Sequence, residues 1–283
     1  MNQKHIFAFW EPRENLPAYL ELCMKTWKKF LPEYEIHLLD YKSIIQWLSP
    51  SEIKQFQCPS RCSLAMQADI YRALLLSKHG GLWLDCDTII TSRKAADFLD
   101  STPTDFSLFG TPDRRITHAA CLYAKKPHLS IIEEWVNELN ETMPLIRMRY
   151  GNRFYYIIYR ILNILKIVKK IYWGSAFNAI MDKLVYKSDE NEVTVWSRED
   201  PKYGVFPELR TSYTFADQSV IDNYVKFWFS ECSSTNDFMN ESGIIMLHNG
   251  WTPSKYRKMK EEEFLSQNIR LSLFIKNLLS LDS

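Results

Sequence analysis

The amino-acid sequence predicts an α/β fold built on a parallel sheet, and three observations support that prediction. Short apolar runs that end at polar or breaking residues recur through the first half of the chain, as buried strands do. Stretches with apolar residues at helical spacing separate these runs. The chain has 283 residues, of which 46% are hydrophobic, so it can bury one large core. Because alternating strands and helices form parallel sheets, we expect a single domain of this class.

The first five elements are predicted from residues 6–84. In chain order they are a strand at 6–10 that ends at Glu11-Pro12, a helix at 17–30, a strand at 35–39, a helix at 63–78 that Gly80-Gly81 stops, and a strand at 82–84. The last of these strands runs directly into Asp85-Cys86-Asp87. Ligands of open α/β sheets bind beyond the carboxyl ends of the strands, so this acidic pair lies where a site is expected.

The elements predicted after residue 100 follow a weaker pattern. They are strands at 106–110 and 119–124, a helix at 128–142, short strand-like pieces at 192–205, a strand at 244–247 and a helix at 261–281. The strand at 244–247 leads into His248-Asn249-Gly250-Trp251, which is a second candidate site at a strand end. The final helix is expected to cap the domain or to meet a partner.

Residues 147–173 differ from the rest of the chain in composition. They hold seven basic residues and no acidic one, together with many Tyr, Phe, Ile and Leu residues. A basic, aromatic-rich amphipathic helix is typical of a segment that lies in a membrane interface, and residues 154–171 carry too many charges for a membrane span. The sequence leaves open the alternative of an ordinary packed helix whose basic residues face solvent.

Charge and cysteine usage exclude several classes of protein. The chain has 35 basic and 34 acidic residues, so its formal charge of +1 gives no reason to expect a nucleic-acid partner. Its six cysteines are scattered, with Cys58 and Cys62 as the sole short spacing, which favours reduced thiols over a zinc site or a disulfide framework. No secretion signal is expected at the start, and we expect a cytoplasmic protein, peripheral at the inner face of the cell membrane if residues 147–173 bind lipid.

The spacing of Asp85 and Asp87 suits a divalent cation. On an extended segment, two residues separated by one point to the same side, so both carboxylates can reach one ion. Mg²⁺ or Mn²⁺ held in this way can bridge phosphate oxygens and neutralise a leaving diphosphate. An isolated Asp-x-Asp is more often a solvated turn or a helix cap, so the surrounding residues decide the interpretation.

Those surrounding residues resemble a known family. Ala68-Asp69 is followed three residues later by Arg72, then by an apolar run, by Gly80-Gly81 and by Asp85-Cys86-Asp87. This order resembles the Asp-x-Asp family of retaining glycosyltransferases, which includes bacterial capsule and lipopolysaccharide transferases, Golgi outer-chain mannosyltransferases and the sugar-transferring domains of large clostridial toxins. The resemblance extends over roughly the first 130 residues and over islands thereafter.

The resemblance implies a fold, a division of the chain and a reaction. The fold is GT-A, a Rossmann-like nucleotide-diphospho-sugar transferase domain with helical additions. Residues 1–145 are then the nucleotide-sugar-binding core, residues 146–175 a basic aromatic segment at the membrane or the acceptor, and residues 176–283 the remainder of the catalytic domain. The reaction moves a hexose from a nucleotide-sugar, with UDP-sugar favoured, to a saccharide or a lipid-linked saccharide of a bacterial surface polysaccharide, with Mn²⁺ or Mg²⁺ as cofactor.

The resemblance also implies roles for individual residues. Trp10 matches an aromatic residue that packs on the nucleobase, Asp69 a carboxylate that binds sugar hydroxyls, and Arg72 a basic residue that reaches the sugar or its phosphate. The implied catalytic residues are Asp69, Arg72, Asp85 and Asp87, and the implied cation ligands are Asp87, Asp85 and His248. The implied donor-binding residues are Phe9, Trp10, Asp69, Arg72, Asp85, His248, Asn249 and Trp251.

Some features depart from the family, and two other functions stay open. Gly174-Ser175-Ala176 stands where the family often has Gly-Pro, which leaves the acceptor undefined. A metal-dependent nucleotide-sugar hydrolase or phosphoesterase is one alternative, because carboxylates and a histidine can also bind catalytic cations. The other is a non-enzymatic adaptor at the membrane surface whose basic helix binds anionic lipid.

Overall fold

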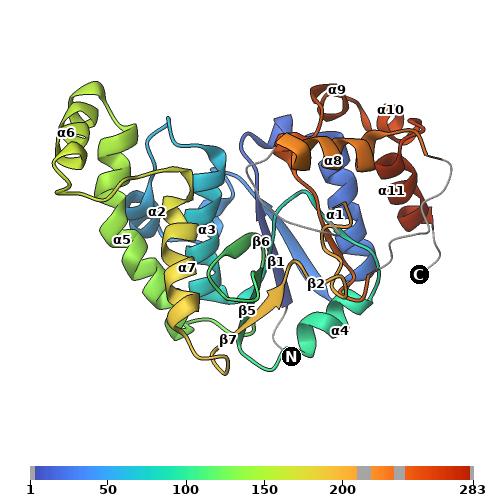
Figure 1. Cartoon of the computed structure of the whole chain (residues 1–283), viewed down its shortest axis with the longest axis horizontal. Helices are drawn as coiled ribbons and strands as arrows, with labels where there is room; N and C mark the ends of the chain where they lie inside the picture. Colours follow the sequence, from blue (N-terminus) through green and yellow to red (C-terminus); the bar gives the residue numbers. More distant parts are fainter. Residues whose placement is uncertain (1–3, 209–217, 233–239, 281–283) are drawn as a thin grey trace.

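The computed structural model describes residues 4–208, 218–232 and 240–280, and Figure 1 shows the whole chain. The strands are β1 (Lys4–Phe9), β2 (Tyr34–Leu39), β3 (Gly81–Leu84), β4 (Thr88–Ile90), β5 (Phe106–Gly110), β6 (Thr117–Ala124), β7 (Val193–Ser197) and β8 (Ile244–Met246). The helices are α1 (Ala18–Phe30), α2 (Pro50–Phe56), α3 (Leu64–His79), α4 (Lys94–Asp100), α5 (Ser130–Tyr150), α6 (Arg153–Ile164), α7 (Asn178–Lys187), α8 (Gln218–Phe229), α9 (Ser254–Arg257), α10 (Glu261–Leu265) and α11 (Arg270–Ser280). Short 3₁₀ helices include η2 (Ile44–Gln46), η3 (Trp173–Ala176) and η5 (Asn249–Trp251).

The central sheet is mixed, with strand order β2-β1-β3-β6-β5-β7. β1 is parallel to β2 and β3, and β7 is parallel to β5, as the alternation of strands and helices predicts. β6 is antiparallel to both of its neighbours, β3 and β5, so the prediction of a wholly parallel sheet is wrong at this strand. Only residues 111–116 join β5 to β6, and so short a connection allows an antiparallel pair but not a crossover. The predicted α/β class is confirmed.

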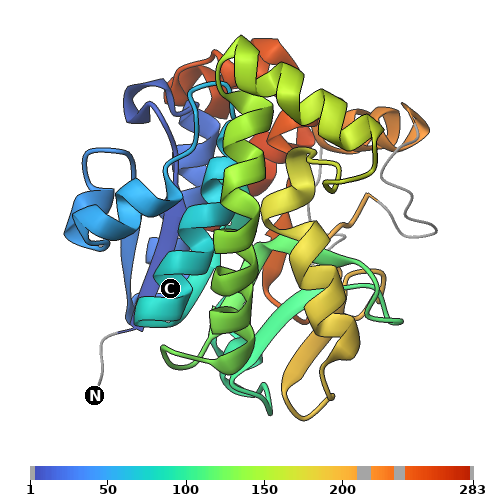
Figure 2. The same cartoon turned by 90° about the vertical axis from the view of Figure 1, so that its left-hand side faces the viewer.

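Helices cover both faces of the central sheet. α3, α5 and α7 run side by side over one face, as Figure 2 shows, and α1, α8 and α11 lie on the other side in Figure 1. Side chains of a strand alternate between faces, and β1 follows this rule. Its Phe7 and Phe9 belong to the apolar cluster under α3 and α5, while Ile6 and Ala8 belong to the cluster under α1 and α11.

A second, two-stranded sheet brings together segments that are far apart in the chain. β4 follows the acidic pair and pairs antiparallel with β8, with Thr88 opposite Met246. α1 holds this sheet in place, because the buried Trp27 donates from Nε1 to the carbonyl oxygen of Thr88 at 2.7 Å. The strand predicted at 244–247 therefore exists, but it pairs beside the acidic turn instead of extending the main sheet.

The structure divides two segments that the sequence predicts as continuous helices. The predicted helix at 261–281 is α10 followed by α11, and Leu281 lies outside the described residues. Arg270 N–H donates to the carbonyl oxygen of Ser230 and Cys232 N–H to that of Asn268, so pairing with residues 230–232 interrupts the helix. The basic segment at 147–173 contains the end of α5, then α6 after a break at Gly151, then a connection to η3.

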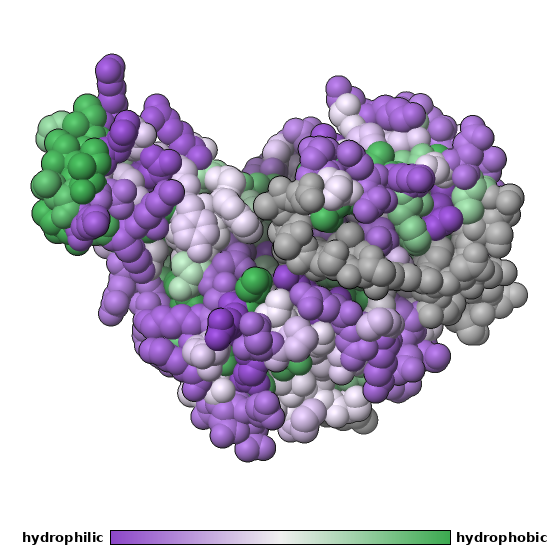
Figure 3. All heavy atoms as spheres, viewed as in Figure 1, coloured by the Kyte–Doolittle hydropathy of each residue, from purple (hydrophilic) through white to green (hydrophobic). Residues whose placement is uncertain are grey.

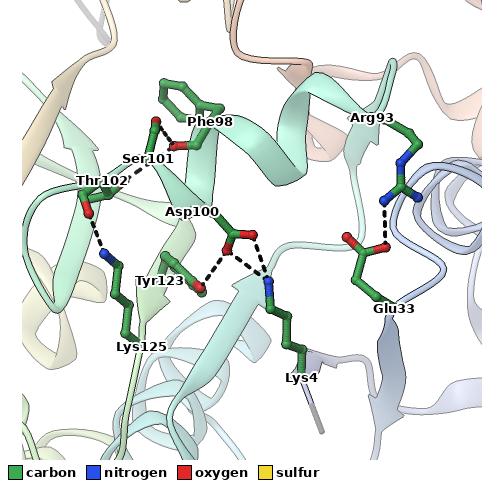
Figure 4. A network of polar contacts seen from close by, with 9 residues as sticks. All are labelled: Lys4, Glu33, Arg93, Phe98, Asp100, Ser101, Thr102, Tyr123 and Lys125. Carbon is green, nitrogen blue, oxygen red and sulfur yellow. Dashed lines mark hydrogen bonds and ion pairs between the residues drawn. The ribbon is translucent and has the colours of Figure 1, made fainter. Parts of the chain in front are cut away.

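α4 is fastened across one end of the central strands, where β1 begins and the antiparallel β6 ends. Lys4 of β1 donates to both carboxylate oxygens of Asp100 at 2.9 Å, and the Tyr123 hydroxyl of β6 donates to Asp100 at 3.4 Å, as Figure 4 shows. Lys125 donates to the carbonyl oxygen of Thr102 just beyond α4. These polar contacts hold α4 against this end of the strands. The opposite end, where β3 ends, carries no such cover from α4.

Among the described helices, none combines the length and the apolar character that crossing a membrane requires.

Candidate functional site

A cavity of about 740 Å³ lies at the end of the central strands where β3 ends and β6 begins. Seven of the nine residues predicted for the site line this cavity: Asp69, Arg72, Asp85, Asp87, His248, Asn249 and Trp251. They come from α3, from the turn after β3 and from the segment after β8. The structure therefore brings the two candidate strand-end sites into one place.

The acidic pair lies in a tight turn. β3 ends at Leu84, and the Thr88 N–H donates to the carbonyl oxygen of Asp85 at 2.9 Å. The expectation of an extended segment is therefore wrong, although both carboxylates still line the cavity. Cys86 between them is buried against the backbone of Phe9, so the turn directs its two acidic side chains away from the core.

Arg72 joins Asp69 to Asp85. Arg72 Nη1 lies 3.5 Å from Asp69 Oδ1 on the same helix, and Arg72 Nη2 lies 2.9 Å from Asp85 Oδ1. Residues three apart on a helix share a face, as the sequence predicts, but Asp69 and Arg72 are only 5% and 3% exposed, so they are not a surface pair. Burial raises the pKa of the Asp69 carboxyl to about 7 despite the attraction of Arg72. Trp83 Nε1 also donates to Asp85 Oδ1, at 2.8 Å.

Asp87 is fixed by the second strand-end segment. The backbone N–H of Asn249 donates to Asp87 Oδ2 at 2.8 Å, and the N–H of Leu247 donates to the carbonyl oxygen of Asp87 at 3.0 Å. The pKa of the Asp87 carboxyl is raised, chiefly by burial and then by the neighbouring charge of Asp85. The buried Tyr19 hydroxyl donates to Asn249 Oδ1 at 2.6 Å, which holds the segment against α1.

His248 is packed among aromatic rings at the cavity. Its ring is stacked on Phe206 with centroids 5.2 Å apart and lies 3.9 Å from the Trp251 ring centroid. Burial, with a smaller contribution from Arg198, lowers the pKa of His248 to about 3, so its imidazole is neutral at pH 7. Among the described residues, the ligand atoms of Asp85, Asp87 and His248 are too far apart to lie within 4.8 Å of one another. A different trio, away from the cavity, meets that distance. The predicted role of His248 as a cation ligand stays a prediction.

Phe9 and Trp10 lie apart from the cavity lining. The Phe9 ring is 5% exposed and packs 4.8 Å from the Tyr71 ring, measured between centroids. Trp10 is half-buried beside the apolar cluster under α1, and its backbone N–H donates to the carbonyl oxygen of Leu39. Neither side chain is among the described residues that line the cavity. The predicted contact of Trp10 with the nucleobase and the predicted donor-binding role of Phe9 stay predictions.

Several cavity residues were missed by reasoning from the sequence. Arg198, 5% exposed, follows β7 directly and adds a second guanidinium to the lining, so the strand-end rule applied to 193–197 could have found it. Asp182 of α7 accepts hydrogen bonds from the N–H and hydroxyl of Thr117 at 2.7 and 2.6 Å. Tyr172 and Trp173 also line the cavity. No local pattern in the sequence marks these three, because α7 and η3 reach the site only through the packing of α7 on β6.

The acidic turn is suited to a divalent cation. The hydrogen bonds among the described residues involve Oδ1 of Asp85 and Oδ2 of Asp87, so the second oxygen of each carboxylate is available to a ligand. The cavity lining holds Asp69, Asp85, Asp87 and Asp182 against two guanidinium groups, and burial raises the pKa of three of these carboxyls. A hard cation prefers carboxylate oxygens and would offset the repulsion that raises the pKa of Asp87.

Fold and cavity define an α/β protein with a candidate site in the cavity where β3 ends. The family model described as capsular polysaccharide synthesis protein matches residues 1–170, which is more than half of the sequence. The chain belongs to this family of capsular polysaccharide synthesis proteins. A search of curated proteins found no match.

Three solved structures illustrate what the chain is similar to, and two of them, GlyE and PaToxG, are glycosyltransferases by their names. The glycosyltransferase GlyE of Streptococcus pneumoniae TIGR4 matches with a TM-score of 0.44 and 14% identity over 100% of this chain and 61% of GlyE, so the chain spans less than two thirds of that protein. An active-site mutant of LgtC matches with a TM-score of 0.44 and 11% identity, covering 99% and 98% of the two chains. The PaToxG glycosyltransferase matches with a TM-score of 0.32 and 14% identity over 64% of this chain and 74% of that one. Likeness at these TM-scores has no weight in assigning a function to this chain.

Proposed function

We propose that the protein is a metal-dependent, retaining GT-A glycosyltransferase of capsular polysaccharide synthesis. It transfers a hexose from a nucleotide-sugar, with UDP-sugar as the favoured donor, to a saccharide or lipid-linked saccharide. The observation that carries the proposal is the hydrogen bond of 2.8 Å from Asn249 N–H to Asp87 Oδ2, which joins the two strand-end segments around one cavity. Family membership supports the place of the reaction in polysaccharide synthesis.

Asp85 and Asp87 are the residues that would hold Mn²⁺ or Mg²⁺ at this site. The cation, when bound, supplies charge that neutralises the diphosphate of the donor and of the leaving group. Arg72 orients Asp85 through its contact of 2.9 Å, so its role in this proposal is to position a cation ligand as much as to meet the donor. The Asn249 amide orients Asp87 in the same way.

The remaining lining residues would position the donor and exclude water. Asp69, a buried residue of the cavity lining, would accept hydrogen bonds from sugar hydroxyls. Arg198 adds positive charge to the lining, which favours a phosphate. A retaining transfer on the front face of the sugar needs no protein nucleophile, and preorganised charge then supplies most of the rate enhancement.

Calorimetry of UDP binding tests the role of the acidic turn. We expect the wild-type protein to bind UDP with Mn²⁺ present, and the Asp87→Asn variant to lose at least about tenfold in affinity, as removing support from a metal site does. Asparagine keeps an oxygen that can accept from Asn249, so the turn should fold. Glu262→Gln, which changes an exposed carboxylate on α10, is the matched control and should bind as the wild type does. Equal UDP affinity in wild type and Asp87→Asn would refute the cation role.

Turnover with and without an acceptor separates transfer from hydrolysis. A transferase releases UDP faster when a saccharide acceptor is added, whereas a nucleotide-sugar hydrolase releases it at the same rate. Hydrolases with two cations usually need more carboxylates and histidines around the site. Among the described residues, His5, Glu35 and His37 form a trio whose ligand atoms lie within 4.8 Å of one another. None of these three residues lines the cavity. The structure therefore gives the hydrolase alternative no specific support.

We also propose that α6 docks on an anionic membrane surface. Phe154, Ile157, Ile161 and Ile164 follow helical spacing along one face of α6, and they are 67%, 49%, 52% and 70% exposed. Tyr159, on the other face, is buried and accepts a hydrogen bond from Ile171 N–H at 2.7 Å. Figure 3 shows apolar atoms gathered over α6 at the left edge of the molecule.

Charge and position both favour a lipid surface for this face of α6. Arg153, Arg160, Lys166 and Lys170 flank the apolar side chains and are exposed, so they can meet anionic headgroups. The segment that follows α6 continues to Tyr172 and Trp173, which line the cavity. Docking through α6 would thus hold the cavity close to acceptors that are anchored in lipid.

Vesicle flotation tests the proposed docking of α6. We expect the protein to float with vesicles that contain phosphatidylglycerol and not with pure phosphatidylcholine vesicles. Replacing Ile157, Ile161 and Ile164 by serine should abolish flotation, because apolar burial and charge attraction act together. Ile45→Ser, at a residue of η2 that is 62% exposed, is the matched control. Flotation that survives the triple replacement would show that α6 is not the docking surface.

A further inference from the structure

A second cluster of side chains that can bind a metal ion lies at the other end of the strands from the cavity. His5 of β1 and Glu35 of β2 are direct neighbours in the parallel register, and His37 lies two residues beyond Glu35. Side chains two apart on a strand share a face, so all three project from the face that α3 covers. Both histidines are partly buried, with side chains 23% and 11% exposed, and Glu35 is half exposed.

The spacing of the three ligand atoms is close to that of a tetrahedral metal site, and the two histidines hydrogen-bond to each other. His5 Nδ1 lies 3.0 Å from His37 Nε2, and Glu35 Oε2 lies 3.9 and 3.8 Å from these two nitrogens. Ligands of a tetrahedral Zn²⁺ ion at about 2.0–2.1 Å are about 3.3 Å apart, so shifts of a few tenths of an ångström would bring all three atoms onto one ion. The carboxylate is open to solvent, which leaves the fourth position to water.

We propose that His5, Glu35 and His37 form a Zn²⁺ site that clamps β1 to β2. Two imidazoles and one carboxylate, with an aromatic wall, are a donor set that suits zinc better than Mg²⁺ or Ca²⁺. The wall is Trp47, whose ring centroid is 4.3 Å from that of His37 and 5.5 Å from that of His5.

The proposed zinc site is separate from the donor cavity. His5 lies beside Gly81 at the start of β3, since a Cβ placed on Gly81 would be 2.8 Å from the His5 carbonyl oxygen. The acidic turn begins after the other end of β3, four residues and about 13 Å further on. The two sites can therefore be emptied and tested one at a time.

Zinc calorimetry on the full chain, after removal of metals by EDTA and without nucleotide, tests the clamp. We expect one Zn²⁺ to bind per chain, also in the Asp87→Asn background, which excludes binding at the acidic turn. Glu35→Gln and His37→Gln should each weaken binding at least about tenfold, since losing a ligand costs no less than losing its support. His128→Gln, at an exposed histidine that lies 3.1 Å from Glu133, is the matched control and should bind normally.

A stability measurement gives an independent readout of the clamp. Zn²⁺ should raise the Tm of the wild-type protein and of His128→Gln, and leave the Tm of Glu35→Gln unchanged, because only a ligand that binds the folded state stabilises it. Glu35 is half exposed, so Glu35→Gln should fold even if His37→Gln does not. The proposal is overturned if the wild type shows no saturable zinc binding, or if Glu35→Gln binds zinc and gains Tm as the wild type does.

Discussion

Replacing Arg72 by methionine tests how the floor of the cavity tolerates its buried charges. Asp69 is 5% exposed, and its carboxylate lies 3.5 Å from the Arg72 guanidinium, which also contacts Asp85 at 2.9 Å. Methionine keeps much of the length of the side chain and removes the charge. The Arg72→Met variant therefore leaves Asp69 as a buried carboxylate without its cation.

The expected loss in the free energy of unfolding at pH 8 is about 3–4 kcal/mol. About 1.5–3 kcal/mol of this comes from the lost hydrogen bonds of the Arg72 guanidinium to Asp85 and to the carbonyl oxygen of Ala119. At most about 1.4 kcal/mol comes from Asp69, because a carboxyl with a folded pKa of about 7 loses only about one pKa unit of free energy at pH 8 when it stays protonated. Adding Asp69→Asn to Arg72→Met removes the orphaned charge. We expect this second change to restore most of the part of the loss that depends on pH, because asparagine does not ionise.

The loss caused by Arg72→Met should depend on pH. Burial already raises the pKa of Asp69 to about 7, and Arg72 opposes that rise, so the pKa is higher still in the variant. A carboxyl whose pKa is higher in the folded state than the ordinary 3.8 stabilises the protein only while it is protonated, and that contribution is lost as pH rises through the folded pKa. The loss should therefore be about 1.4 kcal/mol smaller at pH 5, where Asp69 is protonated in both proteins, than at pH 8.

Urea unfolding at pH 5 and pH 8 measures these differences in the wild type, Arg72→Met and Arg72→Met with Asp69→Asn. Arg257→Met, at an exposed arginine of α9, is the control and should change the free energy of unfolding by less than about 0.5 kcal/mol. A loss below about 1 kcal/mol at pH 8, or an equal loss at both pH values, would refute the reasoning, since a screened surface pair behaves in that way.

Three further changes have clear expected results in urea unfolding. Gly243→Ala should lower the free energy of unfolding by about 1–3 kcal/mol, because Gly243 has φ of 67° and a Cβ there would be 2.6 Å from a backbone nitrogen of α4. Gly250→Ala is the control and should change the free energy of unfolding little, because a Cβ there would meet no atom within 4 Å. Tyr19→Phe should cost about 1–2 kcal/mol through the lost hydrogen bond to Asn249, and no loss would show that water replaces it. Burial lowers the pKa of His248 to about 3, so the stability from its neutral ring is complete above about pH 6.5 and is lost as pH falls toward 3. The wild type should therefore lose more stability between pH 7 and pH 4.5 than a His248→Asn variant does, and equal losses in the two proteins would contradict this.

Elements defined by local interactions were predicted closely from the sequence. The helix predicted at 63–78 is α3, Leu64–His79, because Ser63 caps it and Gly80 ends it with a positive φ of 64°. The strand at 82–84 is β3, and the acidic pair follows it at the edge of the sheet. Patterns of this kind depend on residues within a few positions of one another, so the sequence displays them directly.

Errors in the prediction arose where distant segments compete with local preference. Helical spacing continues from 261 to 281, yet backbone pairing of 268–270 with 230–232 divides the helix. Spacing likewise gave an extended acidic segment, but the pairing of β4 with β8 forces the chain to turn at Asp85–Asp87. Hydrogen bonds between segments that lie 36 or more residues apart leave no local trace in either partner.

Taken alone, the sequence determined the α/β class, the order of its first elements and the chemistry of the acidic pair, because apolar periodicity and residue type are local properties. Only the tertiary structure decided that His248 and Asn249 meet Asp87, that Arg198 and Asp182 complete the cavity, and that His5, Glu35 and His37 converge at the other edge. Each of these groupings joins side chains from separate elements. Their distances follow from strand order, register and helix packing, which depend on the burial of the whole core and on no single segment.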